Sequence, residues 1–409
     1  MTQPRSRKPA ASEWPALGVE QRPWASRINS DDLTMAQRER VRLPYSASIV
    51  PPIANLPVNV PGVLAADADE ATQLLTRFDA EVGPGGPPFA SILLRTESAS
   101  SSEIEQLTSG ARAIAEAELG ERETGNAAQI VRNVRTMEAA SALADDVDEQ
   151  SIVAMQSALV GSSAPELTVR WRDEQVWIGG GSLSPHLAEF VPPHQERVPA
   201  AMSDLVTFMG RLDIPVLAHL AIAHAQFETI HPFPDGNGRT GRALVQAMLR
   251  HREVTTNITV PVSAGLLHDV DGYYDALNAY RRGEIGPIVT AFARAASYAV
   301  LNGRQLVRDI KGLQGDWEDK MHGLRSDAAA RRVAVLAIAH PALNYELVAR
   351  ELAIAPNTAL RALEALVDRG VLRTANSRRR NRIWLADPVL RSLDDFAARA
   401  ARRRVPSAP

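Results

Sequence analysis

Helical periodicity dominates the pattern of apolar and polar positions along this chain. Apolar residues recur at the spacing that places them on one face of an α-helix over most of its length. The pattern predicts helices over 66–78, 103–119, 127–144, 152–159, 199–212, 214–230, 242–249, 266–282, 285–307, 328–339, 343–352 and 359–369. We therefore expect a mostly α fold.

Strand-like stretches are few and short. Residues 166–172 and 175–178 predict a β-hairpin ahead of the helix at 214–230, and residues 371–373 and 382–385 predict a second strand pair near the C-terminus. Residues 1–40 are polar and show no sustained period, so we expect a disordered or loosely docked segment. The proline-bearing stretch that follows, to residue 66, predicts extended chain lying over another surface.

Composition narrows the class of protein without naming its function. The chain has 409 residues, 45% of them hydrophobic and 23% charged, which is ordinary for a globular protein of more than one domain. Its net charge of −3 gives no general attraction to nucleic acid or membrane. The absence of cysteine excludes disulfides and fits a reducing cytosol. With no signal peptide and no long apolar run, we expect a cytoplasmic protein without a membrane span.

The stretch 231–242 gathers more candidate chemistry than any other part of the chain. It reads His-Pro-Phe-Pro-Asp-Gly-Asn-Gly-Arg-Thr-Gly-Arg and leads into a predicted helix. The run Gly236, Asn237 and Gly238 tolerates unusual backbone angles, so successive N–H groups can turn toward an anion. Arg239 and Arg242 are three residues apart and can both reach a phosphate chain. The stretch therefore predicts a phosphate site at a helix N-terminus.

Two further residues of the stretch suit a reaction at that phosphate. Asp235 would repel a phosphate directly, but it is a suitable ligand for Mg²⁺, which binds one or two carboxylates together with substrate phosphates. His231 is the nearby group whose ordinary pKa suits proton abstraction near neutral pH. The competing interpretation is a polar loop at a helix start with a hydrogen-bonded histidine.

Residues 231–242 resemble the motif of the Fic family, His-Pro-Phe-x-Asp/Glu-Gly-Asn-Gly-Arg-x-x-Arg, and match it at every fixed position. The resemblance covers roughly residues 90–310. It implies a helical domain that transfers AMP from ATP to a Ser, Thr or Tyr hydroxyl of a target protein, and of itself. It implies His231 as the base, Asp235 as the Mg²⁺ ligand and Gly236 to Arg242 as the nucleotide site. Tyr274 is a candidate for the adenine pocket, although tyrosines at helical spacing are usually core residues.

The same resemblance suggests an inhibitory helix. Fic proteins can carry the pattern Ser/Thr-x-x-x-Glu-Gly/Asn, and Ser101 and Glu105 fit it, while Gln106 stands where Gly or Asn is usual. The plain alternative is that the serines cap the helix predicted to begin at residue 103. In the family a hairpin ahead of the motif helix, the flap, aligns the target as an added strand. Residues 166–178 stand at that place.

The C-terminal elements resemble a winged helix domain, because two helices are followed by a third and then by a strand pair. Five arginines lie on the predicted wing: Arg373, Arg378, Arg379, Arg380 and Arg382. They suit contact with DNA, but a solvated turn or a protein-docking surface explains them equally. The predicted division is 1–40, 41–160 with the inhibitory helix, 161–312 as the Fic catalytic domain, 326–390 as the winged helix domain and 391–409 as a basic tail.

Three functions compete at this stage. The first is AMP transfer to an unknown protein target with ATP and Mg²⁺. The second is another Fic activity, namely phosphate transfer, phosphocholine transfer or removal of AMP, although the intact Gly-Asn-Gly-Arg stretch argues against phosphate transfer. The third is a transcriptional regulator that senses nucleotide and binds DNA through the winged helix. The sequence leaves the oligomeric state open, with a homodimer as one alternative.

Overall fold

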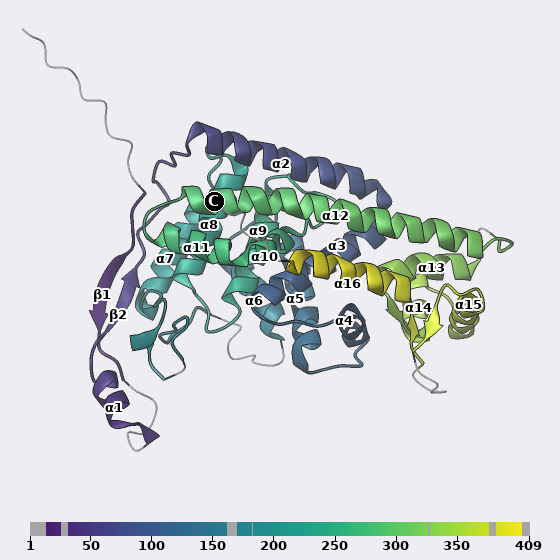
Figure 1. Cartoon of the computed structure of the whole chain (residues 1–409), viewed down its shortest axis with the longest axis horizontal. Coiled ribbons are helices and arrows are strands. Elements are labelled where there is room, and N and C mark those ends of the chain that lie inside the picture. Colours follow the sequence, from purple (N-terminus) through teal and green to yellow (C-terminus); the bar gives the residue numbers. More distant parts are fainter. Residues whose placement is uncertain are drawn as a thin grey trace, which may run out of the picture.

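The structure, a computed structural model, describes residues 14–25, 32–161, 170–181, 183–325, 328–375 and 382–402. The described chain is mostly helical, as its apolar spacing predicts (Figure 1). Its helices are α1 (Met35–Val41), α2 (Gly62–Val82), α3 (Pro87–Ile104), α4 (Ala111–Glu118), α5 (Gly125–Ala142), α6 (Glu149–Val160), α7 (Val198–Met209), α8 (Val216–Ile230), α9 (Asn237–His251), α10 (Val262–His268), α11 (Val270–Arg281), α12 (Gly286–Lys320), α13 (Ala329–Ala339), α14 (Tyr345–Leu352), α15 (Pro356–Asp368) and α16 (Asp387–Ala401).

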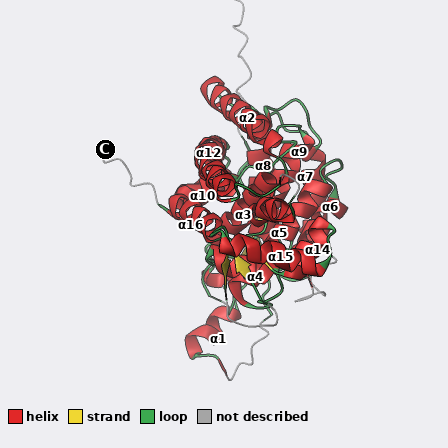
Figure 2. Ribbon diagram, turned by 90° about the vertical axis from the view of Figure 1, so that its right-hand side faces the viewer, coloured by secondary structure: helices red, strands yellow, loops and turns green. Residues whose placement is uncertain are grey.

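The centre of the molecule is α8. Every residue of this helix except its first is buried, and α7, α9, α11 and α12 pack around it (Figures 1 and 2). An α-helix that is apolar on all sides belongs in a core, so the sequence of α8 explains its position. Helix α2 lies along α12 over much of its length (Figure 1). The carboxyl end of α8 and the start of α9 are therefore held between several packed layers.

A two-stranded ribbon corrects the prediction for the N-terminal segment. Strand β1 (Gly18–Arg22) pairs antiparallel with β2 (Tyr45–Ile49), and the N–H of Leu17 donates to the carbonyl of Arg281 at 3.0 Å. The expectation of disorder or loose docking is thus wrong for residues 14–25. Strand β1 forms because it pairs with β2, which is distant in sequence. The local pattern of apolar and polar residues therefore does not predict it.

The segment that holds Ser101 and Glu105 also differs from its prediction. Instead of one helix over 103–119, the chain forms α3, which ends at Ile104, and then α4. The serines therefore lie in the last turns of a helix and do not cap the start of one. They remain helical because they are buried and bond to the preceding turn: Ser98 Oγ donates to the carbonyl of Leu94 at 2.8 Å.

Three further boundaries differ from the prediction. The stretch 266–282 is two helices, α10 and α11, because the side chain of Asp269 accepts from the N–H of Gly272 and caps a new helix. Helix α12 continues to Lys320, so the boundary predicted at residue 312 falls inside it. In the flap, the stretch 175–178 forms one bridge pair, Ile178 with Phe190, and no strand. Most of the first flap strand, 166–169, lies outside the described residues.

The C-terminal elements follow the predicted order as far as residue 385, but residues 391–401, which were expected to be part of a basic tail, belong to α16. Helices α13, α14 and α15 are joined by a small sheet of β3 (Ala342–Leu343), β5 (Trp384–Leu385) and β4 (Arg373–Thr374). Helix α16 then returns along α12 and contacts α3 and α4 (Figure 1). The unit is therefore packed against the helix that carries Ser101 and Glu105. That it is a winged helix domain stays a prediction.

Candidate functional site

The candidate site is the loop between α8 and α9, which the sequence singles out as residues 231–242. His231 ends α8 in the left-handed conformation, with φ 51° and ψ 62°, and Gly236 starts α9 with φ 76°. A side chain at Gly236 would also meet Leu159 of α6 at 2.6 Å. Two reversals of the backbone thus place the end of one buried helix beside the start of the next. Glycine is required at the second reversal, both for the backbone angle and for the space.

His231 is poised as a neutral imidazole. Burial, and then the positive charge of Arg172, lower the pKa of His231 to about 3. The ring is therefore uncharged at neutral pH and can accept a proton. Its Nδ1 atom is buried without a hydrogen-bond partner among the described residues. A pKa this low makes the resting imidazole a weak base, so the role of His231 stays a prediction.

The predicted anion site lies at the N-terminus of α9. Gly238, Arg239 and Arg242 all lie in the first two turns of this helix, where free N–H groups and the helix dipole favour negative charge. The Asn237 side chain is already used, because its amide both accepts from the N–H of Phe233 at 2.8 Å and donates to the carbonyl of Phe233 at 2.7 Å. The Asn237 side chain thus stabilises the loop. Asn237 would therefore bind a phosphate through its main-chain N–H.

Asp235 is the one carboxylate of the loop and faces solvent, with its side chain 76% exposed. Arg239 Nη2 lies 3.7 Å from Asp235 Oδ2, and burial lowers the pKa of Arg239. In the part of the chain that the structure describes, no group of three or more His, Cys, Asp or Glu residues could hold a metal by itself. The arrangement fits Mg²⁺ only in the predicted form, with one carboxylate and the substrate phosphates as ligands.

A carboxylate from α3 reaches into this anion site. Arg242 Nη2 donates to Glu105 Oε1 at 3.0 Å, and Arg242 also donates to the hydroxyl of Ser101 at 2.9 Å and to its carbonyl at 2.6 Å. A Cβ atom on Gly238 would lie 1.9 Å from Glu105 Oε1. The Glu105 carboxylate therefore sits directly on the first turn of α9. Ser101 and Glu105 of the predicted inhibitory pattern thus both contact Arg242 of the motif.

The Arg242 guanidinium is fully enclosed, whereas the Glu105 side chain is 39% exposed. Burial alone would lower the pKa of Arg242, but Glu105, Tyr273 and Glu228 together raise it above its usual value. The guanidinium thus stays charged inside the protein. It is a fixed cation, and Glu105 is a partner that solvent can reach.

The residue after Glu105 carries backbone strain. Gln106 has φ 61°, in the left-handed region that glycine and asparagine enter at little cost. This conformation gives a physical reason why Gly or Asn suits the position. In this chain the turn that presents Glu105 is made with a less suitable residue.

Tyr274 lies beside the same turn. Its side chain is 44% exposed, and its hydroxyl donates to the carbonyl of Ile104 at 3.2 Å. The neighbouring Tyr273 is buried and bonds to His224 at 2.8 Å, as a core residue would. The structure thus places Tyr274 at the end of α3, next to Glu105. Its part in an adenine pocket stays a prediction.

A groove of about 920 Å³ opens next to the motif loop. Pro234 of the loop forms one part of its wall, and the flap segment, defined here as residues 173–181, forms another. Trp24 and Tyr45 of the N-terminal ribbon line the opposite part, and Trp24 packs edge-to-face on Trp177 with ring centroids 5.4 Å apart. The groove is a wide, partly aromatic channel that leads toward the loop.

Sequence reasoning missed two residues that hold the loop. Gln156 of α6 donates to the carbonyl of Asp235 at 2.8 Å and accepts from the hydroxyl of Thr240 at 2.6 Å. Arg172, which is 3% exposed, donates to the carbonyl of His231 at 2.8 Å. Neither lies in the motif, and neither shows a local pattern, because their roles arise only when distant segments meet.

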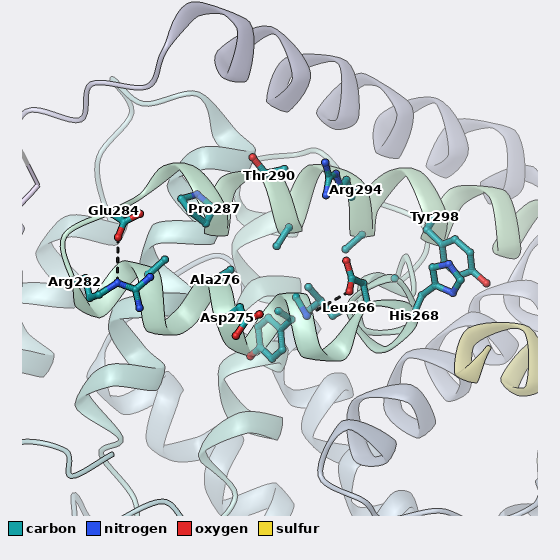
Figure 3. A pocket seen from close by; sticks show the side chains of 17 residues that line it. Leu266, His268, Asp275, Ala276, Arg282, Glu284, Pro287, Thr290, Arg294 and Tyr298 are labelled. Atoms are coloured by element: carbon teal, nitrogen blue, oxygen red, sulfur yellow. Dashed lines mark hydrogen bonds and ion pairs between the residues drawn. The ribbon is translucent and has the colours of Figure 1, made fainter. Parts of the chain in front are cut away.

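A second groove, of about 510 Å³, lies between α10, α11 and the first turns of α12 (Figure 3). In Figure 3 the Arg282–Glu284 pair stands at one end of it, and the His268 ring stacks on Tyr298 at the other. None of its lining residues belongs to the motif loop. We therefore assign the anion site to the start of α9 and not to this groove.

On the predicted wing, two of the five arginines are within the described residues. Arg373 pairs with Asp387, its Nη2 lying 2.9 Å from Oδ1, and Arg382 lies 3.4 Å from Glu364. Both thus already have carboxylate partners. Arg378, Arg379 and Arg380 lie outside the described residues. A search of the described helices for one long and apolar enough to cross a bilayer finds none.

Comparison with known proteins places the motif loop in a family. The model of the Fic/DOC family matches residues 146–249, which contain the whole loop. A protein adenylyltransferase of Caenorhabditis elegans is 27% identical over 159 residues, 38% of this chain and 28% of that protein. A probable protein adenylyltransferase of Aquifex aeolicus is 38% identical over 93 residues, 20% of this chain and 29% of that protein. The matches thus span about a third of these relatives.

Among solved structures, a Fic family protein from Desulfovibrio desulfuricans has a TM-score of 0.52 at 21% identity. The match covers 81% of this chain and 97% of that one. At this identity the likeness concerns the fold, and it extends beyond the segment that the family model matches.

Proposed function

We propose that this chain, a Fic-family protein, is a protein adenylyltransferase that Glu105 inhibits. It transfers AMP from ATP to a hydroxyl side chain of a target protein and of itself. The observation that carries the proposal is the placement of a neutral base, His231, at the end of the helix that leads to the anion site of α9. The other Fic activities lack an observation that favours them.

The reaction follows from these groups. The target hydroxyl is a weak nucleophile, so His231 accepts its proton as the oxygen attacks the α-phosphorus of ATP. A bond forms between that oxygen and phosphorus, the bond from the α-phosphorus to the bridging oxygen breaks, and pyrophosphate leaves. Charge on the phosphate oxygens is met by the N–H groups at the start of α9 and by Arg239 and Arg242. Because these groups are already in position, they stabilise the charge of the transition state without moving, and this lowers the activation barrier.

Asp235 is the residue that would hold Mg²⁺, together with the phosphates of ATP. When bound there, the ion neutralises phosphate charge. The exposed carboxylate suits this role because it can reach toward ATP from the rim of the site. Tyr274 is assigned to the adenine end of the nucleotide on its position beside α3.

Glu105 supplies the inhibition. Its carboxylate pairs with Arg242 and lies on Gly238, where an anionic group of the nucleotide would otherwise bind. ATP that enters beside this carboxylate is displaced, and a small displacement of the α-phosphate costs a large factor in rate. Ser101 holds Arg242 in place for the same contact. The wild-type chain is therefore expected to be weakly active.

The target protein enters along the groove beside Pro234. An extended segment could pair with the backbone of the flap segment, which gives affinity and leaves side-chain specificity loose. The proposed setting is the cytoplasm. DNA binding by the C-terminal unit is a separate proposal and rests on Arg378, Arg379 and Arg380.

A direct test uses the purified Glu105→Gly variant with ATP and Mg²⁺. An intact-mass gain matching AMP, on the protein itself or on a protein of a cell lysate, is the expected result. A mass gain matching phosphate would replace AMP transfer by phosphate transfer, and no gain on any protein would reject both.

A further inference from the structure

We propose that Arg172 is a positioning residue for this reaction, which holds the base His231 and the flap segment at a fixed separation. The inference rests on the proposed function, because it assigns His231 the role of base. Arg172 does not touch the anion site. It acts through the main chain of the loop.

The contacts of Arg172 join its own segment to three parts of the chain. Its Nε donates to the carbonyl of His231 at 2.8 Å, and its own N–H donates to the carbonyl of Pro232 at 2.8 Å. Its Nη1 donates to the carbonyl of Glu174 in the flap segment at 2.9 Å, and its Nη2 donates to the carbonyl of Pro193. One side chain therefore fixes the motif loop, the flap segment and the loop before α7 relative to one another.

These contacts need an arginine. The guanidinium presents five N–H donors in a planar fork, so it can reach carbonyls in three directions at once. A lysine carries its donors on a single atom and could satisfy one or two of them. The guanidinium donates its hydrogen bonds to main-chain carbonyls, and the negative charge of Glu174 also favours its charged form. Burial of a cation is costly, and an arginine placed in this way is unusual for a residue that only fills space.

The loop needs such support because His231 is held in an unfavourable conformation. A residue with a side chain in the left-handed region costs on the order of 1–2 kcal/mol, and the position is kept only where its surroundings determine it. The His231 carbonyl points to Arg172, which fixes the peptide plane next to the imidazole. The rings of Trp171 and Phe233, 5.2 Å apart, add a second link between the same two segments.

Arg172 also faces the imidazole electrostatically. The charged groups around His231 are Arg172, Arg281 of α11 and Asp235, of which the two arginines oppose protonation and Asp235 favours it. Burial lowers the pKa of Arg172 to about 10, so its charge persists at neutral pH. Removal of this charge should therefore raise the pKa of His231.

The test compares Arg172→Met and Arg172→Lys in the active Glu105→Gly background. We expect Arg172→Met to lower kcat about 100-fold, as a misplaced base does, and to leave the KM for ATP within about twofold. Arg172→Lys should recover part of kcat. The matched control is Arg211→Met, because Arg211 likewise donates to main-chain carbonyls, those of Ala54 and Leu56, but outside the site. It should lower the melting temperature and leave kcat unchanged.

A second readout does not depend on transfer. NMR titration of the His231 ring in Glu105→Gly, with and without Arg172→Met, should show a higher pKa of His231 in the Met variant. If Glu105→Gly transfers no AMP, the proposed function fails, and this titration still decides the role of Arg172. An unchanged kcat and an unchanged His231 pKa in a folded Met variant would overturn the inference. Loss of the fold in both Arg172 variants would also overturn it, since Arg172 would then serve the fold as a whole.

Discussion

The two partners of the Glu105–Arg242 pair belong to regions built in different ways. The motif loop is fixed from several sides, by Gln156 and Arg172, and Arg242 is enclosed and held by Ser101 as well. The end of α3 is held less firmly: the Glu105 side chain is 39% exposed, and the turn after it has a positive φ at Gln106. In the proposed function, catalysis thus depends on a preset site, and inhibition depends on a more exposed segment.

This difference predicts two kinds of mutational effect. A substitution in the motif loop should remove AMP transfer, so that a further substitution at Glu105 has little effect. A change at the end of α3 should raise or lower activity and leave the chemistry intact.

The largest effect should come from His231→Ala. In the Glu105→Gly background the substitution removes the base, which contributes about 10²–10⁴-fold to such reactions. We expect AMP transfer to fall by that factor, with ATP affinity and melting temperature nearly unchanged, because His231 does not contact Arg239 or Arg242 in the described structure. The rate is measured by intact mass, and ATP affinity by calorimetry. Transfer at the parent rate would remove His231 from the mechanism.

Glu105→Gly should raise self-modification about 10- to 100-fold, which corresponds to an interaction of ~1.4–2.8 kcal/mol. The control is Glu103→Gly, which places the same residue type in the same last turn of α3, and Glu103 forms no ion pair among the described residues. If fraying of the helix explained the activation, both variants would be activated equally. Activation by Glu105→Gly alone would assign it to the contact with Arg242.

Gln106→Gly should have a smaller effect of opposite sign. Relief of the left-handed strain is worth about 1 kcal/mol, so the inhibitory turn forms more readily and basal transfer falls about threefold to fivefold. The same substitution in the Glu105→Gly background should change the rate little, because the carboxylate is then absent. Faster transfer by the Gln106→Gly variant would mean that the strained turn helps inhibition.

The smallest effect on transfer should come from the wing. Changing Arg378, Arg379 and Arg380 to alanine alters no residue of the motif loop or of the end of α3, so we expect AMP transfer to stay within about twofold of the parent. If the wing binds DNA, the triple variant should bind a duplex more weakly and with a flatter salt dependence, since fewer counterions are released. Absence of duplex binding by the parent at low salt would end the DNA proposal and favour docking of a protein.

The motif loop was predictable because its chemistry is local. A base, a carboxylate, glycines and arginines stand within twelve consecutive residues, and the helix N-terminus that organises them follows in sequence. The inhibitory pattern that contains Glu105 was also visible in the sequence, although 137 residues separate Glu105 from its partner Arg242. A short sequence motif singled out Glu105, which the periodicity of apolar residues could not do.

The structure around these residues was less predictable, for a physical reason in each case. Residues 97–102 have few strong helix formers, so the helix appeared to start later, but burial of Ser101 and Ser102 stabilises α3. Strand β1 depends on a partner more than twenty residues away. Arg172 looks like part of a surface strand in sequence, and only the assembled fold turns its guanidinium toward carbonyls of three segments.

The central claim is that Glu105 inhibits AMP transfer that His231 catalyses. A single time course tests it, with AMP incorporation followed by intact mass for the wild type, Glu105→Gly, and the double variant Glu105→Gly with His231→Ala. We predict slow incorporation by the wild type, faster incorporation by Glu105→Gly by about one to two orders of magnitude, and almost none by the double variant. Equal rates for the first two would make the end of α3 a structural element only, and incorporation by the double variant at the Glu105→Gly rate would contradict the proposed chemistry.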